Sequence, residues 1–235
     1  GAARPTRAGD APPKRSPRDP DTLGTPLNPD FDSILEGFPK EVPVFPLPEV
    51  VLFPGAVLPL HIFEPRYQRM LEVALAGDRL IAMALLKQPR TDEFHETVCV
   101  GHVIHTEPLP EGRSHIALLG LSAGIAEEVA GETDEPYRTV KVDLLDDHLD
   151  TGASARIKLE KVLPHTVPGA GTVQSLEEQL EKFIAPERIS AALINTCALS
   201  APILPFHKLE LLEERSLARR LDLLIDFIER PWQWN

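Results

Sequence analysis

The chain has 235 residues, of which 43% are hydrophobic, and its formal net charge is -12. This length allows one large domain or two small ones, and the apolar fraction is sufficient for a buried core. The negative charge argues against non-specific binding to nucleic acid or to an anionic membrane, because both depend on lysine and arginine.

The two cysteines, Cys99 and Cys197, lie in apolar segments. A disulfide between them is one interpretation, and two buried thiols in a reducing cytosol are the interpretation that we favour. The basic start of the chain lacks the apolar stretch of a secretory signal. No window reaches the roughly 18 uninterrupted apolar residues of a membrane span, since prolines and Glu49 interrupt the stretch 42–63. We therefore expect a soluble, cytoplasmic protein.

Residues 1–40 are predicted to form a disordered, proline-rich tail. Eight of the 24 prolines fall there, and large apolar residues are scarce before Phe31. Such a segment cannot bury enough surface to offset the entropy lost on ordering. Its first residues are basic, so contact with nucleic acid or an acidic partner is an alternative to a solvated tail. The stretch 31–38, FDSILEGF, is predicted to form a helical turn that docks on the body.

Short strands are predicted from Val42 onward, separated by charged or Gly/Pro-rich turns. They cover 42–47, 56–63, 79–87, 97–107, 115–121 and 139–145, with a weaker candidate at 124–130. One helix interrupts them, beginning at Pro65, where proline is favoured, and ending at Gly77. Several strands with a single early helix predict a small mixed barrel rather than a doubly wound sheet.

Helical spacing replaces the strand pattern after about Asp150. The predicted helices cover 155–163, 175–184, 186–200 and 208–229. Leucine and isoleucine form a stripe along the last one, and charged residues such as Arg220 fall outside that stripe. Pro186 suits a first helical position, and Ser175 suits a cap. The fold class is thus α+β, with a tail at 1–40, a β-rich lobe at 41–149 and an α-helical lobe at 150–235.

The stretch VPVFPLPEVVLFPGAVLPLHIFEPRYQRMLEVAL, which begins at Val42, resembles the opening of the Lon N-terminal domain, the substrate-recognition region of Lon-type ATP-dependent proteases. It is especially similar to small stand-alone bacterial proteins with only this domain, and the resemblance continues to Glu229. It implies a PUA-like β-pseudobarrel and a helical bundle, together one domain at 41–235, that helps to capture unfolded or tagged polypeptides. One departure follows Gly120, where relatives carry Gly-x-x-Arg-Phe and this chain reads GLSAGI.

A search for reactive groups identifies no catalytic, cofactor-binding or metal-binding residues. No Gly-Lys pair exists for a phosphate-binding loop. Ser154 and Lys158 lie near each other on an ordinary amphipathic helix, and a solvated helix face is the interpretation that we favour over a catalytic Ser–Lys dyad. His102 and His105 are three apart on a strand and point to opposite sides, so they do not share a metal.

The most specific segment of the chain also supplies the candidate binding surface. Phe53 stands beside a Pro-Gly turn, where side chains tend to face solvent, and exposed apolar groups at a barrel rim suit extended polypeptide. For Glu64, Arg66 and Tyr67 the structural interpretation is preferred: a helix cap, an ion pair with a neighbouring strand, and an apolar helix face. The candidate surface consists of Leu52, Phe53, Pro54, Phe63 and Arg66.

We expect a non-catalytic module whose partners are unfolded or extended polypeptides and a separate ATP-dependent protease, which it serves as an adaptor or holdase. Nucleic-acid binding and an enzyme with an unrecognised site between the lobes are the two alternatives. Trp232 and Trp234 are expected to pack on the helical lobe, with partner binding as the alternative. The oligomeric state is left open.

Overall fold

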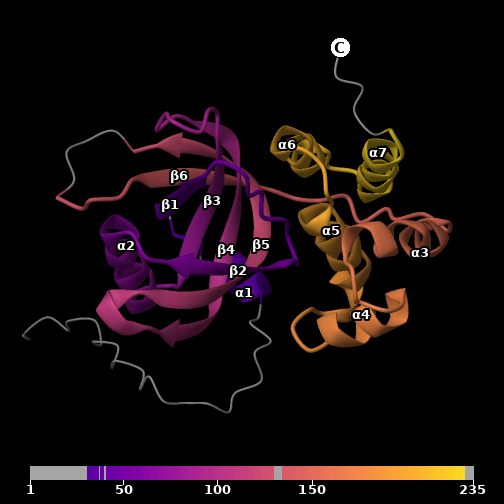
Figure 1. Ribbon diagram of the computed structural model, residues 1–235, viewed down its shortest axis with the longest axis horizontal. Coiled ribbons are helices and arrows are strands. Elements are labelled where there is room, and N and C mark those ends of the chain that lie inside the picture. Colours follow the sequence, from indigo (N-terminus) through magenta and orange to yellow (C-terminus); the bar gives the residue numbers. More distant parts are fainter. Residues whose placement is uncertain (1–30, 37, 40, 130–133, 231–235) are drawn as a thin grey trace, which may run out of the picture.

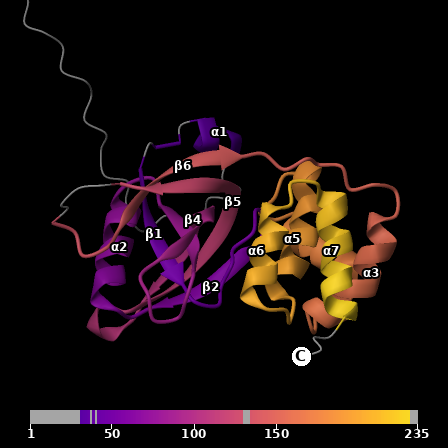
Figure 2. The same ribbon diagram turned by 90° about the horizontal axis from the view of Figure 1, so that it is seen from above.

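The computed structural model describes residues 31–36, 38–39, 41–129 and 134–230. A barrel and a group of helices lie side by side in it (Figures 1 and 2). The predictions for residues 1–30 and for Trp232 and Trp234 fall outside the described residues. No helix within the described ranges is long and apolar enough to cross a membrane.

Six strands form one sheet in the order β2-β5-β4-β3-β1-β6, which β5 closes by pairing with β6 as well. Their bounds are β1 Val42–Leu47, β2 Val57–Ile62, β3 Leu80–Leu86, β4 Phe94–Pro108, β5 Ser114–Glu128 and β6 Thr139–Leu145. The barrel expected from the sequence is confirmed, and the predicted bounds of the first and last strands match those of β1 and β6. Among the strands of the described residues, β1 and β3 form the only parallel pair.

The strand β5 serves two neighbours along one edge. Its first half, up to Leu119, pairs with β2, and its second half, from Ala123, pairs with β6. The sequence predicted two strands here, at 115–121 and 124–130, and that division is wrong. A bulge opposite Val100 and Gly101 leaves Leu121 without a partner on β4 and bends the strand without ending it.

The helix α2 (Pro65–Ala76) packs against β1 and β3. Its buried face includes Tyr67, whose ring lies 4.3 Å from that of Phe45. The predicted proline start and apolar face are confirmed. The predicted cap is wrong, because the Glu64 side chain makes no capping hydrogen bond and instead accepts one from Arg66. The predicted ion pair of Arg66 with a neighbouring strand is replaced by this local pair.

The helical lobe follows β6. It contains α3 Ala155–Thr166, α4 Val173–Leu180, α5 Ile189–Ser200, α6 Pro205–Glu213 and α7 Leu217–Glu229, with a short 3-10 turn from Pro186 before α5. The cap of α4 is Thr172, and Ser175 is its reciprocal partner three residues later. The single helix predicted at 208–229 is broken between Glu214 and Ser216, where Ser216 caps α7.

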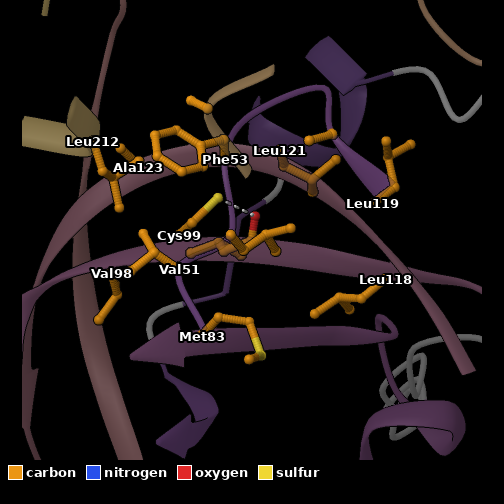
Figure 3. Close-up of a cluster of buried hydrophobic side chains, with 14 of the residues drawn as sticks. Val51, Phe53, Met83, Val98, Cys99, Leu118, Leu119, Leu121, Ala123 and Leu212 are labelled. Carbon is orange, nitrogen blue, oxygen red and sulfur yellow. Dashed lines mark hydrogen bonds between the residues drawn. The ribbon is translucent and has the colours of Figure 1, made fainter. Parts of the chain in front are cut away.

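The exposure predicted for Phe53 is wrong, and its neighbour Leu52 is also fully buried. Figure 3 shows Phe53 in a cluster with Cys99 and Leu121 of the barrel and Leu212 of α6. The turn that follows Phe53 lies beneath the helical lobe, and this is why a turn residue is not solvent-facing. Both cysteines are buried and free, so the disulfide interpretation does not hold.

Candidate functional site

The five predicted surface residues occupy three different environments. Leu52 and Phe53 belong to the core. Pro54 is half-buried and lines a cavity between the lobes. Phe63 and Arg66 are exposed at the opposite end of β2, roughly 17 Å along that strand. The structure therefore offers two candidate sites, a surface around Phe63 and the cavity beside Pro54.

Phe63 is 57% exposed and stands next to two histidines. Its ring lies 5.6 Å from that of His61, which in turn lies 5.0 Å from the ring of His115 on β5. All three side chains are exposed. We call His61, Phe63 and His115 the aromatic row. Rings of this kind present both an apolar face and hydrogen-bonding edges to a bound chain.

The start of α2 fixes the backbone beneath the aromatic row. Gln68 donates hydrogen bonds to the carbonyl of Phe63 at 3.1 Å and to that of Glu111 at 3.2 Å. Arg66 lies over the ring of Tyr67, 4.6 Å from its centroid, while it is bonded to Glu64. The backbone that carries the exposed Phe63 side chain is thus held by hydrogen bonds from the start of α2.

The strand β2 lies at the edge of the sheet and has no second strand partner among the described residues. The Gly120 amide donates to the Ala56 carbonyl at 2.9 Å. Because bonded and non-bonded pairs alternate in an antiparallel ladder, Val57, Pro59 and His61 direct their backbone groups away from β5. Proline has no amide hydrogen, so Pro59 costs the ladder nothing at this position. On the outer edge of β2, the amides of Val57 and His61 have no hydrogen-bond partner in the part of the chain that the structure describes.

The second candidate is a cavity of about 250 Å³ at the junction of the two lobes. Apolar lining comes from both lobes, with Leu121 on the barrel side and Ile184 and Ala191 on the helical side. Two of the polar side chains around it, those of Ser122 and Asp147, have structural partners. Ser122 donates to the carbonyl of Leu145, and Asp147 accepts two hydrogen bonds from Arg220. A cavity with this lining is better suited to binding apolar groups than to catalysis.

A buried polar network lies beside the cavity, and the sequence analysis did not predict it. Arg220 of α7 is fully buried, although the helical stripe assigned it to the surface. Its guanidinium donates to both carboxylate oxygens of Asp147, at 2.8 and 3.1 Å, and to the Asn195 side chain at 2.6 Å. Asn195 donates to the Pro54 carbonyl at 2.8 Å. No local pattern signals these contacts, because their members are 25 to 141 residues apart.

The departure after Gly120 also has a structural basis. The Gly-x-x-Arg-Phe pattern that the resemblance implies would place its arginine at position 123 and its phenylalanine at position 124, where this chain has Ala123 and Gly124. Ala123 is buried, and a Cβ on Gly124 meets the Val142 side chain at 2.4 Å. The two strands β5 and β6 pack too closely here to admit an aromatic side chain. This chain has no basic-aromatic pair at these two positions, and the pairing of β5 with β6 leaves no space for an aromatic side chain at position 124.

No group of three or more histidine, cysteine, aspartate and glutamate side chains converges to hold a metal ion in the part of the chain that the structure describes. Burial raises the pKa of the Cys99 thiol well above its usual range, which is unsuitable for a nucleophile. Burial also raises the pKa of the Cys197 thiol. Neither cysteine has the low pKa of a reactive thiol.

A family model described as the ATP-dependent protease La (LON) substrate-binding domain matches residues 41–230. The Lon protease of Parabacteroides distasonis is 26% identical over 213 residues, which are 87% of this chain and 25% of that protein. The Lon protease of Aquifex aeolicus is 23% identical over 154 residues, 62% of this chain and 18% of that protein. The chain thus spans a quarter or less of the length of these relatives.

Solved structures show the same fold. The N-terminal domain of Mycobacterium avium complex Lon protease superposes with a TM-score of 0.56 at 17% identity, covering 81% of this chain and 98% of that one. The Lon N-terminal domain protein from Xanthomonas campestris gives a TM-score of 0.54 at 18% identity, covering 80% and 98%. The α+β fold, a barrel followed by helices, is shared with both.

Proposed function

We infer that this protein is a polypeptide-binding module, because the chain belongs to the family of LON substrate-binding domains. The domain that the match covers is a non-catalytic one, and it accounts for nearly all of the described residues. We propose that the aromatic row and the outer edge of β2 form the surface that holds an extended or unfolded chain.

The single observation that carries this assignment is a phenylalanine at a sheet edge whose backbone is held by a hydrogen bond while its side chain is exposed. Phe63 is 57% exposed, and Gln68 fixes its carbonyl. An extended polypeptide bonds to such an edge through its backbone, and its apolar side chains find contact on the exposed rings. Backbone recognition tolerates many sequences, as an unfolded-protein binder requires. Arg66 is the residue of the predicted set that adds a charge at this corner.

The test uses a labelled, reduced and carboxymethylated protein that stays unfolded in buffer. Phe63→Ala is expected to weaken its binding about tenfold, measured by fluorescence anisotropy, because truncating a central aromatic contact typically costs more than about 1 kcal/mol. Ile157→Ala is the matched control, since Ile157 is 72% exposed on α3, outside the proposed surface. Equal affinities for the two variants would overturn the assignment of the surface.

We further propose that the protein acts as an adaptor or holdase in protein quality control, in the cytoplasm, and passes bound chains to an ATP-dependent protease on a separate chain. The Lon proteases among its relatives support this role, because the matched domain is a part of each of them. The same two variants test the holdase role: Phe63→Ala is expected to lose suppression of substrate aggregation, and Ile157→Ala is expected to keep it.

A further inference from the structure

The cavity between the lobes already has an occupant at its rim. The helix α1 (Phe31–Glu36) lies beside the barrel on the side nearest the helical lobe (Figure 1), and Leu35 is one of the residues that line the cavity. Ile34, Leu35 and Phe38 are half-buried and pack against the hydrophobic core. The family match begins at residue 41, so α1 precedes the domain that the relatives share.

The sequence of this segment has the pattern of a groove-binding helix. In the sequence, Phe31, Ile34, Leu35 and Phe38 follow one another at spacings of three, one and three residues, a pattern typical of one apolar helical face, and α1 covers the first part of it, Phe31–Glu36. Short helices that bind in trans insert the same spacing of apolar anchors into a groove. The cavity of about 250 Å³ that remains beside Leu35 is smaller than a typical small-molecule site.

The packing of α1 against the rest of the protein buries little apolar surface. Ile34 and Leu35 are only half-buried, and Glu36 is exposed. A helix of six residues is too short to persist without its packing contacts. Elements with few buried apolar groups open at low free-energy cost, so α1 is able to leave while the rest of the fold persists.

We propose that the inter-lobe cavity is a docking site for a short amphipathic helix of another polypeptide, and that α1 is the built-in occupant which such a helix displaces. The partner has apolar residues at the α1 spacing and inserts one of them where Leu35 now lies. This site is separate from the aromatic row, and it recognises a helix rather than an extended chain. The N-terminal segment thereby regulates access to the cavity.

The test uses a fluorescent synthetic peptide of residues 29–40, PDFDSILEGFPK, and full-length protein. The Leu35→Asp protein is expected to bind this peptide about tenfold more tightly than the wild type, because its own helix no longer competes. A peptide that itself carries Leu35→Asp is expected not to bind either protein. This peptide control does not depend on the folding of any protein variant. Equal affinity of the unmodified peptide for both proteins, or no binding to either, overturns the proposal.

A second pair of variants locates the binding site. Leu149 is 51% exposed and lines the cavity, whereas Ile157 is 72% exposed and lies outside it. Adding Leu149→Asp to Leu35→Asp is expected to reduce peptide affinity about tenfold, and adding Ile157→Asp is expected to leave it unchanged. An equal loss in both double variants overturns the assignment to the cavity. Phe63→Ala leaves the affinity for this peptide unchanged, which separates the result from that for unfolded protein.

Discussion

His102 is a histidine that the fold holds in its neutral form. It lies on β4, opposite Leu80 of β3 and Leu119 of β5, and its Nδ1 is buried without a hydrogen-bond partner among the described residues. Burial is the main cause that lowers its pKa to about 4, and the nearby Arg79 acts in the same direction. His105, on the same strand, is exposed. The alternation from which opposite sides were predicted does not hold, because a bulge between Val103 and His105 places His102 opposite Leu119 and His105 opposite Ala117.

This difference predicts a pH dependence of stability. The unfolded chain has a histidine pKa of about 6.5, above the folded value of about 4, so it binds more protons between these pH values. The contribution of neutral His102 is complete above pH 6.5 and is lost as the pH falls toward 4. We expect this loss to be about 2 kcal/mol after allowance for partial solvent exposure. Urea unfolding between pH 7 and 4 measures it.

The matched variants are His102→Gln and His105→Gln. The first is expected to flatten the pH dependence of the free energy of unfolding across this window, and the second is expected to keep the wild-type slope. Identical slopes for the wild type and His102→Gln would show that other groups account for the acid sensitivity.

At the scale of elements, β5 is the strand on which the barrel depends. It pairs with β4 along its length, with β2 in its first half and with β6 in its second. Gly120 lies at the bend between the halves, where the backbone of Phe53 crosses it so closely that a Cβ would meet the Phe53 carbonyl oxygen at 2.1 Å. The glycine is required by this close approach, since its backbone conformation alone does not demand it.

Gly120→Ala is therefore expected to lower the free energy of unfolding by about 3 kcal/mol, because neither backbone can yield without breaking the β2–β5 pairing. Gly77→Ala at the end of α2 is the control for backbone conformation: a Cβ there meets nothing closer than 3.6 Å, and the change is expected to cost only about 1 kcal/mol, because the ψ of −132° at this position is uncommon for alanine. Chemical denaturation compares the two. Equal stabilities would show that the Phe53 turn moves freely.

At the scale of the whole molecule, a few polar contacts join the barrel to the helices. Asn195 of α5 holds the Pro54 carbonyl, and Thr97 of β4 donates to Glu213 at 2.9 Å. Arg220 connects α7 to Asp147, which belongs to the segment that leaves the barrel. Two of the acceptor residues, Pro54 and Asp147, also line the cavity between the lobes.

Arg220→Met is expected to lower the free energy of unfolding by about 3 kcal/mol, because Asp147, of which the side chain is only 10% exposed, would keep only the longer contact with Arg215 at 3.5 Å. Arg219→Met is the neighbouring control: its side chain is 77% exposed, and its ion pair with Glu214 is worth about 0.5 kcal/mol or less. Adding Asp147→Asn to Arg220→Met should recover part of the loss. No recovery would mean that packing, and not the unpaired charge, dominates.

The sequence by itself determined the kind and order of the elements: strands through Leu145, one helix beginning at Pro65, and helices from Ala155 onward. These follow from side-chain periodicity and proline positions, which are local properties. The tertiary structure alone decided that β5 is continuous, that Phe53 is buried and that Arg220 is an interior residue. Each of these depends on what another part of the chain, distant in sequence, brings against the residue, and burial by distant segments leaves no trace in local periodicity.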